Sequence, residues 1–100
     1  MILPGLPAPV FPLQAGRFFG LYLVNSSNCL IRWQSRMETR GWYINPDGFF
    51  GPKTHKVVVE FQAEKKLLVD GKIGPVTWSS AWILPMIDRR ETHGKYTIWR

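Results

Sequence analysis

A turn motif that occurs twice constrains the fold of this chain more than any other feature. The sequence DGFFGPKT covers residues 47–54, and DGKIGPVT covers residues 70–77. Both copies have the order Asp, Gly, any residue, a large apolar residue, Gly, Pro, any residue, Thr. Because 100 residues make about one small domain, both turns must serve a single core.

Each position of the motif has a physical use. The first glycine permits the positive φ of a tight turn, and the aspartate before it can accept hydrogen bonds from the following amides. The large apolar residue, Phe50 or Ile73, is expected to point inward, the second glycine allows close backbone approach, and the proline suits the first helical position. The threonine, in the first turn of the helix, can satisfy free amide donors. The ten motif residues are Asp47, Gly48, Gly51, Pro52 and Thr54, and Asp70, Gly71, Gly74, Pro75 and Thr77.

We call the turn motif at residues 47–54 the first corner and the one at residues 70–77 the second corner. The segments around these corners predict three helices. From Asn28 the apolar residues recur at a helical period up to Gly41, a natural stop. Residues 57–61 (VVVEF) favour a strand by propensity, but the unbroken sequence EFQAEKK and charges at spacing four favour a helix that begins at Pro52. A third helix runs from Pro75 to Leu84. We therefore predict a mainly α, compact three-helix bundle, with module boundaries at residues 28–85.

The two ends differ from this helical middle. Four prolines in residues 1–16 predict an extended apolar arm, which has the features of neither a signal peptide nor a membrane span. Residues 17–24 have strand-like composition, so residues 1–27 form an arm and a strand in this interpretation. Residues 86–100 form a charged tail whose segment YTIW alternates like an edge strand. We expect the two strand-like segments to pair.

The composition limits the classes of binding partner that this protein can have. Thirteen Lys and Arg against seven Asp and Glu suit an acidic polymer, such as nucleic acid, an anionic membrane surface or a cell wall. The third predicted helix has no charged residue, which disfavours nucleic-acid binding because a recognition helix needs donors. Cys29 is the one cysteine, so no internal disulfide can form, and we expect it to be a small buried hydrophobe.

The motifs also resemble a known family. The residues that carry the resemblance are Leu30, Trp33, Gln34, Met37, Gly41, Trp42, Asp47, Gly48, Phe50, Gly51, Pro52, Thr54, Val57, Val58, Phe61, Gln62, Leu67, Val69, Asp70, Gly71, Ile73, Gly74, Pro75, Thr77 and Trp78. In this order they are similar to the peptidoglycan-binding domain family, over roughly residues 28–84. The resemblance implies a three-helix module that binds the bacterial cell wall. Residues 40–52 (RGWYINPDGFFGP) are similar in sequence to phage and actinobacterial versions.

Two departures from the family pattern bear on the fold. Lys66 stands where a glycine usually ends the second helix, so either this lysine takes a left-handed conformation or the helix ends differently. Val57 stands where alanine is usual, which requires more room between helices.

Catalysis is not expected. His55 and His93 are too few for a three-ligand zinc site, and no motif of nucleophilic Ser or Cys is present. The two corner aspartates lack the further oxygen ligands of a calcium loop. We therefore predict no metal, no cofactor and no enzymatic activity.

Two functional hypotheses follow. The first is binding of bacterial peptidoglycan by exposed aromatic rings and cations, with candidate contacts Arg40, Trp42, Tyr43, Asn45, Lys53 and Lys72. An alternative interpretation makes Trp42 a core residue. The second hypothesis is a structural or decoration protein, of a phage particle for example, which docks on another protein through residues 1–16.

Overall fold

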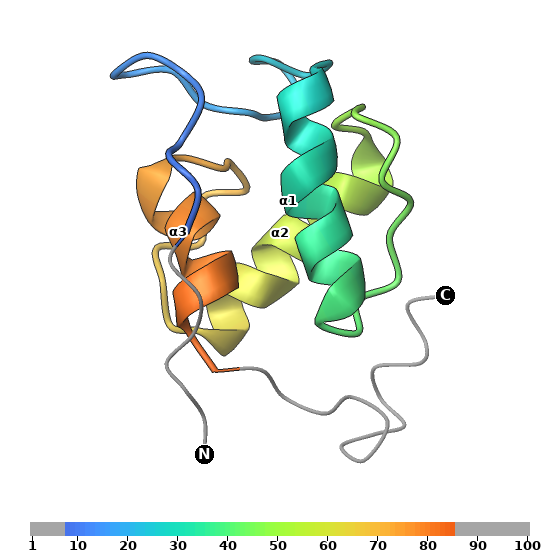
Figure 1. The fold of residues 1–100 in the computed structure, drawn as a ribbon, viewed down its shortest axis with the longest axis vertical. Coiled ribbons are helices and arrows are strands. Elements are labelled where there is room, and N and C mark those ends of the chain that lie inside the picture. The colour runs from blue at the N-terminus through green and yellow to red at the C-terminus, as the bar shows by residue number, and fades with distance from the viewer. Residues whose placement is uncertain (1–7, 86–100) are drawn as a thin grey trace.

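The chain folds as a mainly α domain of three helices. The computed structural model describes residues 8–85. Its helices are α1 (Asn28–Thr39), α2 (Pro52–Glu64) and α3 (Pro75–Ile83), and no sheet is present within residues 8–85. In Figure 1, α2 crosses behind α1, and α3 stands beside both. The predicted fold class is confirmed, and residues 57–61 are helical.

The helix starts follow the local sequence. The Ser27 hydroxyl caps α1 by accepting a hydrogen bond from the Cys29 amide at 3.0 Å. Both α2 and α3 instead begin with a proline after an extended glycine, with no side-chain cap. The two turn motifs are therefore the points at which successive helices begin, as the sequence predicts.

The ends of α1 and α2 share one geometry. At α1 the amides of Gly41 and Trp42 donate to the carbonyls of Glu38 and Met37, and Gly41 has a φ of 97°. At α2 the amides of Lys66 and Leu67 donate to the carbonyls of Ala63 and Gln62, and Lys66 has a φ of 59°. Both are Schellman motifs, which require a left-handed residue. Lys66 thus adopts the left-handed conformation, one of the two outcomes predicted for it.

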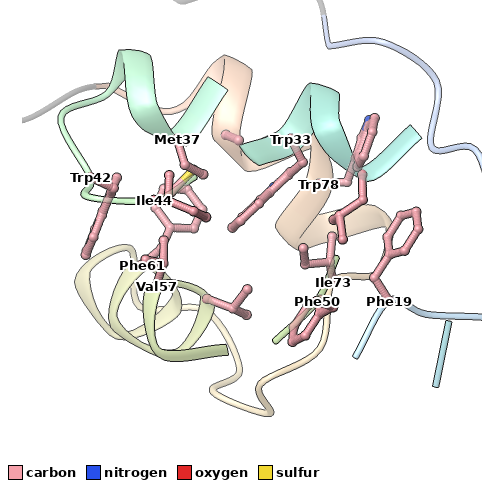
Figure 2. Close-up of a cluster of buried hydrophobic side chains, with 13 residues drawn as sticks. Phe19, Trp33, Met37, Trp42, Ile44, Phe50, Val57, Phe61, Ile73 and Trp78 are labelled. Atoms are coloured by element: carbon pink, nitrogen blue, oxygen red, sulfur yellow. The ribbon is translucent and has the colours of Figure 1, made fainter. Parts of the chain in front are cut away.

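The core lies between the three helices and both corners. Figure 2 shows Trp33 of α1 directed toward the side of the cluster that holds Phe61 of α2, while Trp78 of α3 lies on the other side with Phe19, Phe50 and Ile73. Trp33 and Phe61 meet edge to face, with ring centroids 6.2 Å apart. The buried apolar residues are Phe19, Leu30, Trp33, Met37, Trp42, Ile44, Phe50, Val57, Val58, Phe61, Ile73, Trp78 and Ala81.

The N-terminal segment packs on this same core. The first described residues run alongside α3 (Figure 1), and the Pro9 carbonyl accepts a hydrogen bond from Trp78 Nε1 at 2.8 Å. Phe11 makes edge contacts with the rings of Phe19 and Trp78. Leu13 also packs against the core. Phe11 and Leu13 of the arm therefore lie on their own domain, whereas Val10 is 89% exposed.

Residues 17–24 do not form the predicted strand. Gly20 and Leu23 close a tight turn, so the segment folds back on itself and only isolated bridges remain. Phe19 exchanges both backbone hydrogen bonds with Ile73 of the second corner. The predicted strand partner, YTIW, lies outside the described residues.

Cys29 was expected to be buried, and it is exposed. It lies in the first turn of α1, two residues after the N-cap Ser27. Within residues 8–85, no helix has the length and apolar character needed to cross a membrane.

Candidate functional site

The first corner is held by a buried glutamine from α1. Gln34 Nε2 donates to the Phe49 carbonyl at 3.0 Å, to Thr54 Oγ1 at 3.1 Å and to Asp47 Oδ1 at 3.3 Å. Its Oε1 accepts a hydrogen bond from the Gly48 amide at 2.8 Å. The Asp47 carboxylate also accepts from the Phe49 amide, as the sequence predicts. One side chain thus fixes the turn and the start of the next helix.

The second corner repeats this arrangement. Gln62 of α2 donates from Nε2 to the Lys72 carbonyl, Thr77 Oγ1 and Asp70 Oδ1, at 2.9 to 3.0 Å. Its Oε1 accepts from the Gly71 amide. Gly48 and Gly71 have φ values of 79° and 72°, which glycine adopts readily. The two corners are therefore copies in their hydrogen bonds as well as in sequence.

The role assigned to the threonines needs correction. Thr54 and Thr77 were expected to satisfy free helix amides, but each hydroxyl accepts a hydrogen bond from the preceding helix's glutamine. The two glutamines were recognised only as part of the family pattern. Their helical spacing was the available signal: Gln34 lies four residues after Leu30 and Gln62 four after Val58, on the apolar face of the helix, where a polar group must find hydrogen-bond partners inside.

The two corners differ in the length of the connection that joins each of them to the preceding helix. From the left-handed Gly41 the chain takes six residues to reach Asp47, whereas from Lys66 it takes four to reach Asp70. The extra length at the first corner presents Tyr43 and Asn45 at the surface, while Ile44 turns into the core. This longer connection builds the candidate site.

Two adjoining hollows lie at the first corner. The first, of about 290 Å³, is lined by Ile44, Asn45, Asp47, Phe49, Gly51, Pro52, Lys53 and Thr54. The second, of about 390 Å³, is lined by Tyr43, Ile44, Asn45 and Lys53. They share Ile44, Asn45 and Lys53. We call the pair the first-corner hollow.

Three predicted contact residues come together here: Tyr43, Asn45 and Lys53. The Lys53 ammonium lies 4.4 Å from the centroid of the Tyr43 ring, a cation–π contact. About half of the Tyr43 surface is exposed. An aromatic face, an amide and a cation therefore share one concave surface. Phe49 and Asp47 also line it, and the sequence interpretation did not assign them to a ligand site.

The other three candidates lie elsewhere. Lys72 belongs to the second corner, where its ammonium lies 4.7 Å from the Phe18 ring centroid. Trp42 is 2% exposed and packs edge to face on Phe61, in agreement with its alternative interpretation as a core residue. Arg40 is 3% exposed and does not reach the hollow's lining.

Arg40 instead binds the end of α3. Its guanidinium donates to the carbonyls of Ala81 at 2.6 Å, Ser80 and Pro85 at 3.1 Å each, and Leu84, and it lies over the Phe61 ring. Arg36 adds a hydrogen bond to Ala81 at 2.8 Å, and partial burial lowers its pKa from the ordinary value. Free carbonyls at a helix end attract cations, so this contact joins α1 to α3.

The histidines form no metal site in the described part of the chain. Within residues 8–85, no group of three or more His, Cys, Asp and Glu side chains could hold a metal ion. His55 packs against Gly71 and the Phe50 ring, so it separates the two corners. His93 lies outside the described residues.

Comparison with known proteins agrees with this architecture. Residues 30–80 match the family model described as "Putative peptidoglycan binding domain". The chain is also 37% identical over 59 residues to an "Uncharacterized protein in bpoA1 3'region" of Kitasatospora aureofaciens. That alignment covers 57% of this chain and 45% of the relative, so the chain spans less than half of the relative's length. No solved structure gives a significant match. The family match extends from α1 to α3 and includes both corners, and the chain therefore belongs to the peptidoglycan-binding domain family.

Proposed function

We propose that this domain binds bacterial cell-wall peptidoglycan without catalysis, through the first-corner hollow. The observation that carries the proposal is the cluster of Tyr43, Asn45 and Lys53 on one concave surface of a domain from this family. The same proposal places the protein at the bacterial cell wall.

The chemistry of the hollow suits the polymer. Peptidoglycan presents sugar rings, amides and carboxylates, which match an aromatic face, a side-chain amide and an ammonium respectively. Tyr43 offers ring surface, Asn45 can donate and accept hydrogen bonds, and Lys53 supplies the positive charge. Because the site is open to solvent, the electrostatic part of the affinity should decrease as salt is added.

A binding assay on purified insoluble peptidoglycan tests the proposal. Tyr43→Ala combined with Lys53→Met should weaken binding about tenfold or more, since an aromatic contact and an ionic contact are both lost. Lys72→Met at the second corner is the matched control, because it removes the same charge outside the hollow. Equal binding by the double variant and the wild type, with both folded, would reject the hollow as the site.

The hypothesis of a structural or decoration protein has less support. It depended on an apolar arm that docks on another protein. Within the described residues, Phe11 and Leu13 of that arm pack on the domain's own core. No other observation favours this second role, so we do not propose it.

A further inference from the structure

The Asp47 carboxylate has a hydrogen-bond acceptor oxygen that the fold does not use. Its Oδ1 accepts the hydrogen bonds from Gln34 Nε2 and the Phe49 amide. Among residues 8–85, no hydrogen bond or ion pair involves Oδ2. Asp47 is exposed and lines the smaller hollow. One oxygen therefore holds the corner, and a negatively charged oxygen remains for a ligand.

A positive charge lines the same hollow. Lys53 lines the same hollow as Asp47, and its ammonium lies over the Tyr43 ring. A ligand with a lone carboxylate would be attracted by Lys53 and repelled by Asp47, and a lone amine would meet the reverse. A group that carries both charges would be attracted by both residues. Charge complementarity of this kind acts mainly on specificity.

The volume of the hollow suits a small group. The Asp47 side, which is open to solvent, has a volume of about 290 Å³, near the lower end of the ~300–1,000 Å³ typical of small-molecule sites. This volume matches the end of one amino acid, and the rest of the polymer would extend out of the hollow. The adjoining Tyr43 side, of about 390 Å³, leaves space for the next part of the polymer.

We propose that the Asp47 side of the hollow takes the zwitterionic end of a wall diamino acid, with its ammonium on Asp47 Oδ2 and its carboxylate on Lys53. This inference rests on the proposed function. A cross-link would convert the ammonium into a neutral amide, so the site prefers stem peptides that are not cross-linked at that amine. Asn45 lines both hollows, and its side-chain amide can donate and accept hydrogen bonds with the peptide.

Binding to three insoluble walls tests the inference. The first wall has a diamino acid with a free ammonium and a free carboxylate on one carbon, the second is the same wall after amine acetylation, and the third has a lysine-type stem with the ammonium alone. We expect the first wall to bind about fivefold more tightly than the other two, as for a partly exposed ionic contact. Equal binding to all three would overturn the inference and leave wall binding intact. Absence of binding to every wall would instead reject the proposed function.

The duplicated corner supplies a matched pair of variants. Asp47→Asn keeps an oxygen at Oδ1 for the corner's hydrogen bonds and removes the charge, so the preference for the unacetylated wall should disappear. Asp70→Asn makes the same change at the second corner, where Oδ1 accepts the equivalent bonds, and should keep the preference. A preserved preference in Asp47→Asn would overturn the inference. If Asp47→Asn does not fold, Lys53→Met can be used in its place. Lys53→Met should abolish the preference for the wall that carries the free carboxylate. A retained preference in this variant would also overturn the inference.

Discussion

The two corners of this domain have one framework and different surfaces. Each has a buried glutamine, an aspartate, a left-handed glycine and a threonine in the same hydrogen bonds. The first has a long connection with Tyr43, Asn45 and Lys53 around a hollow, whereas the second exposes Leu68, Val69 and Val76. The difference shows that the repeated motif encodes helix placement, and that the residues outside the motif determine the surface chemistry.

The test with the largest expected effect asks whether both corners contribute to the shared core. It concerns the two inward side chains, Phe50 and Ile73, which are 1% and 0% exposed. Phe50→Ala should lower the free energy of unfolding by about 4 kcal/mol and Ile73→Ala by about 3 kcal/mol, because each leaves a cavity. Urea denaturation followed by tryptophan fluorescence measures both. A loss below about 1 kcal/mol at either position would show that its corner is not part of the shared core.

A second test removes the buried glutamines. Gln34→Leu and Gln62→Leu should each lower the free energy of unfolding by about 2 kcal/mol, because the amide of Gly48 or Gly71 then lacks its acceptor. Denaturation midpoints give the values, and the exposed Gln14, changed to Leu, serves as the control. Clearly unequal losses would mean that the two hydrogen-bond sets differ in strength.

The smallest test concerns the left-handed residues that end α1 and α2. Lys66→Gly should raise the free energy of unfolding by about 0.5–1 kcal/mol, because it removes a side chain from a left-handed position. Gly41→Ala should lower it by about 1 kcal/mol for the converse reason. Thermal unfolding by circular dichroism can resolve the opposite signs. Two changes of the same sign would contradict the shared geometry.

The sequence predicted the helices well because their signals are local. Prolines at the first helical position, Ser27 at the N-cap and Gly41 after α1 lie beside the boundaries that they determine. The inward direction of Phe50 and Ile73 followed from their place in the motif. Such features depend on a few neighbouring residues and need no knowledge of distant contacts.

Long-range contacts were less predictable. The pairing of Phe19 with Ile73 joins segments 54 residues apart, and strand propensity alone suggested a different partner. Arg40 was assigned to a ligand site because arginine pairs well with carboxylates, but the carbonyls at the end of α3 hold it inside. Of the candidate site, Tyr43, Asn45 and Lys53 were predicted together, while the place of Asp47 in the hollow required the fold.

The hydrogen bonds from residues 19–27 to both corners have a practical consequence for recombinant fragments. The Phe50 amide donates to the Asn25 carbonyl, and the Ile73 amide donates to the Phe19 carbonyl. A truncated version that starts at α1 would delete both acceptors together with the aromatic ring of Phe19, which is fully buried. Expression of the minimal binding unit should therefore begin upstream of Phe19, and upstream of Pro9 to keep the hydrogen bond from Trp78 Nε1 as well.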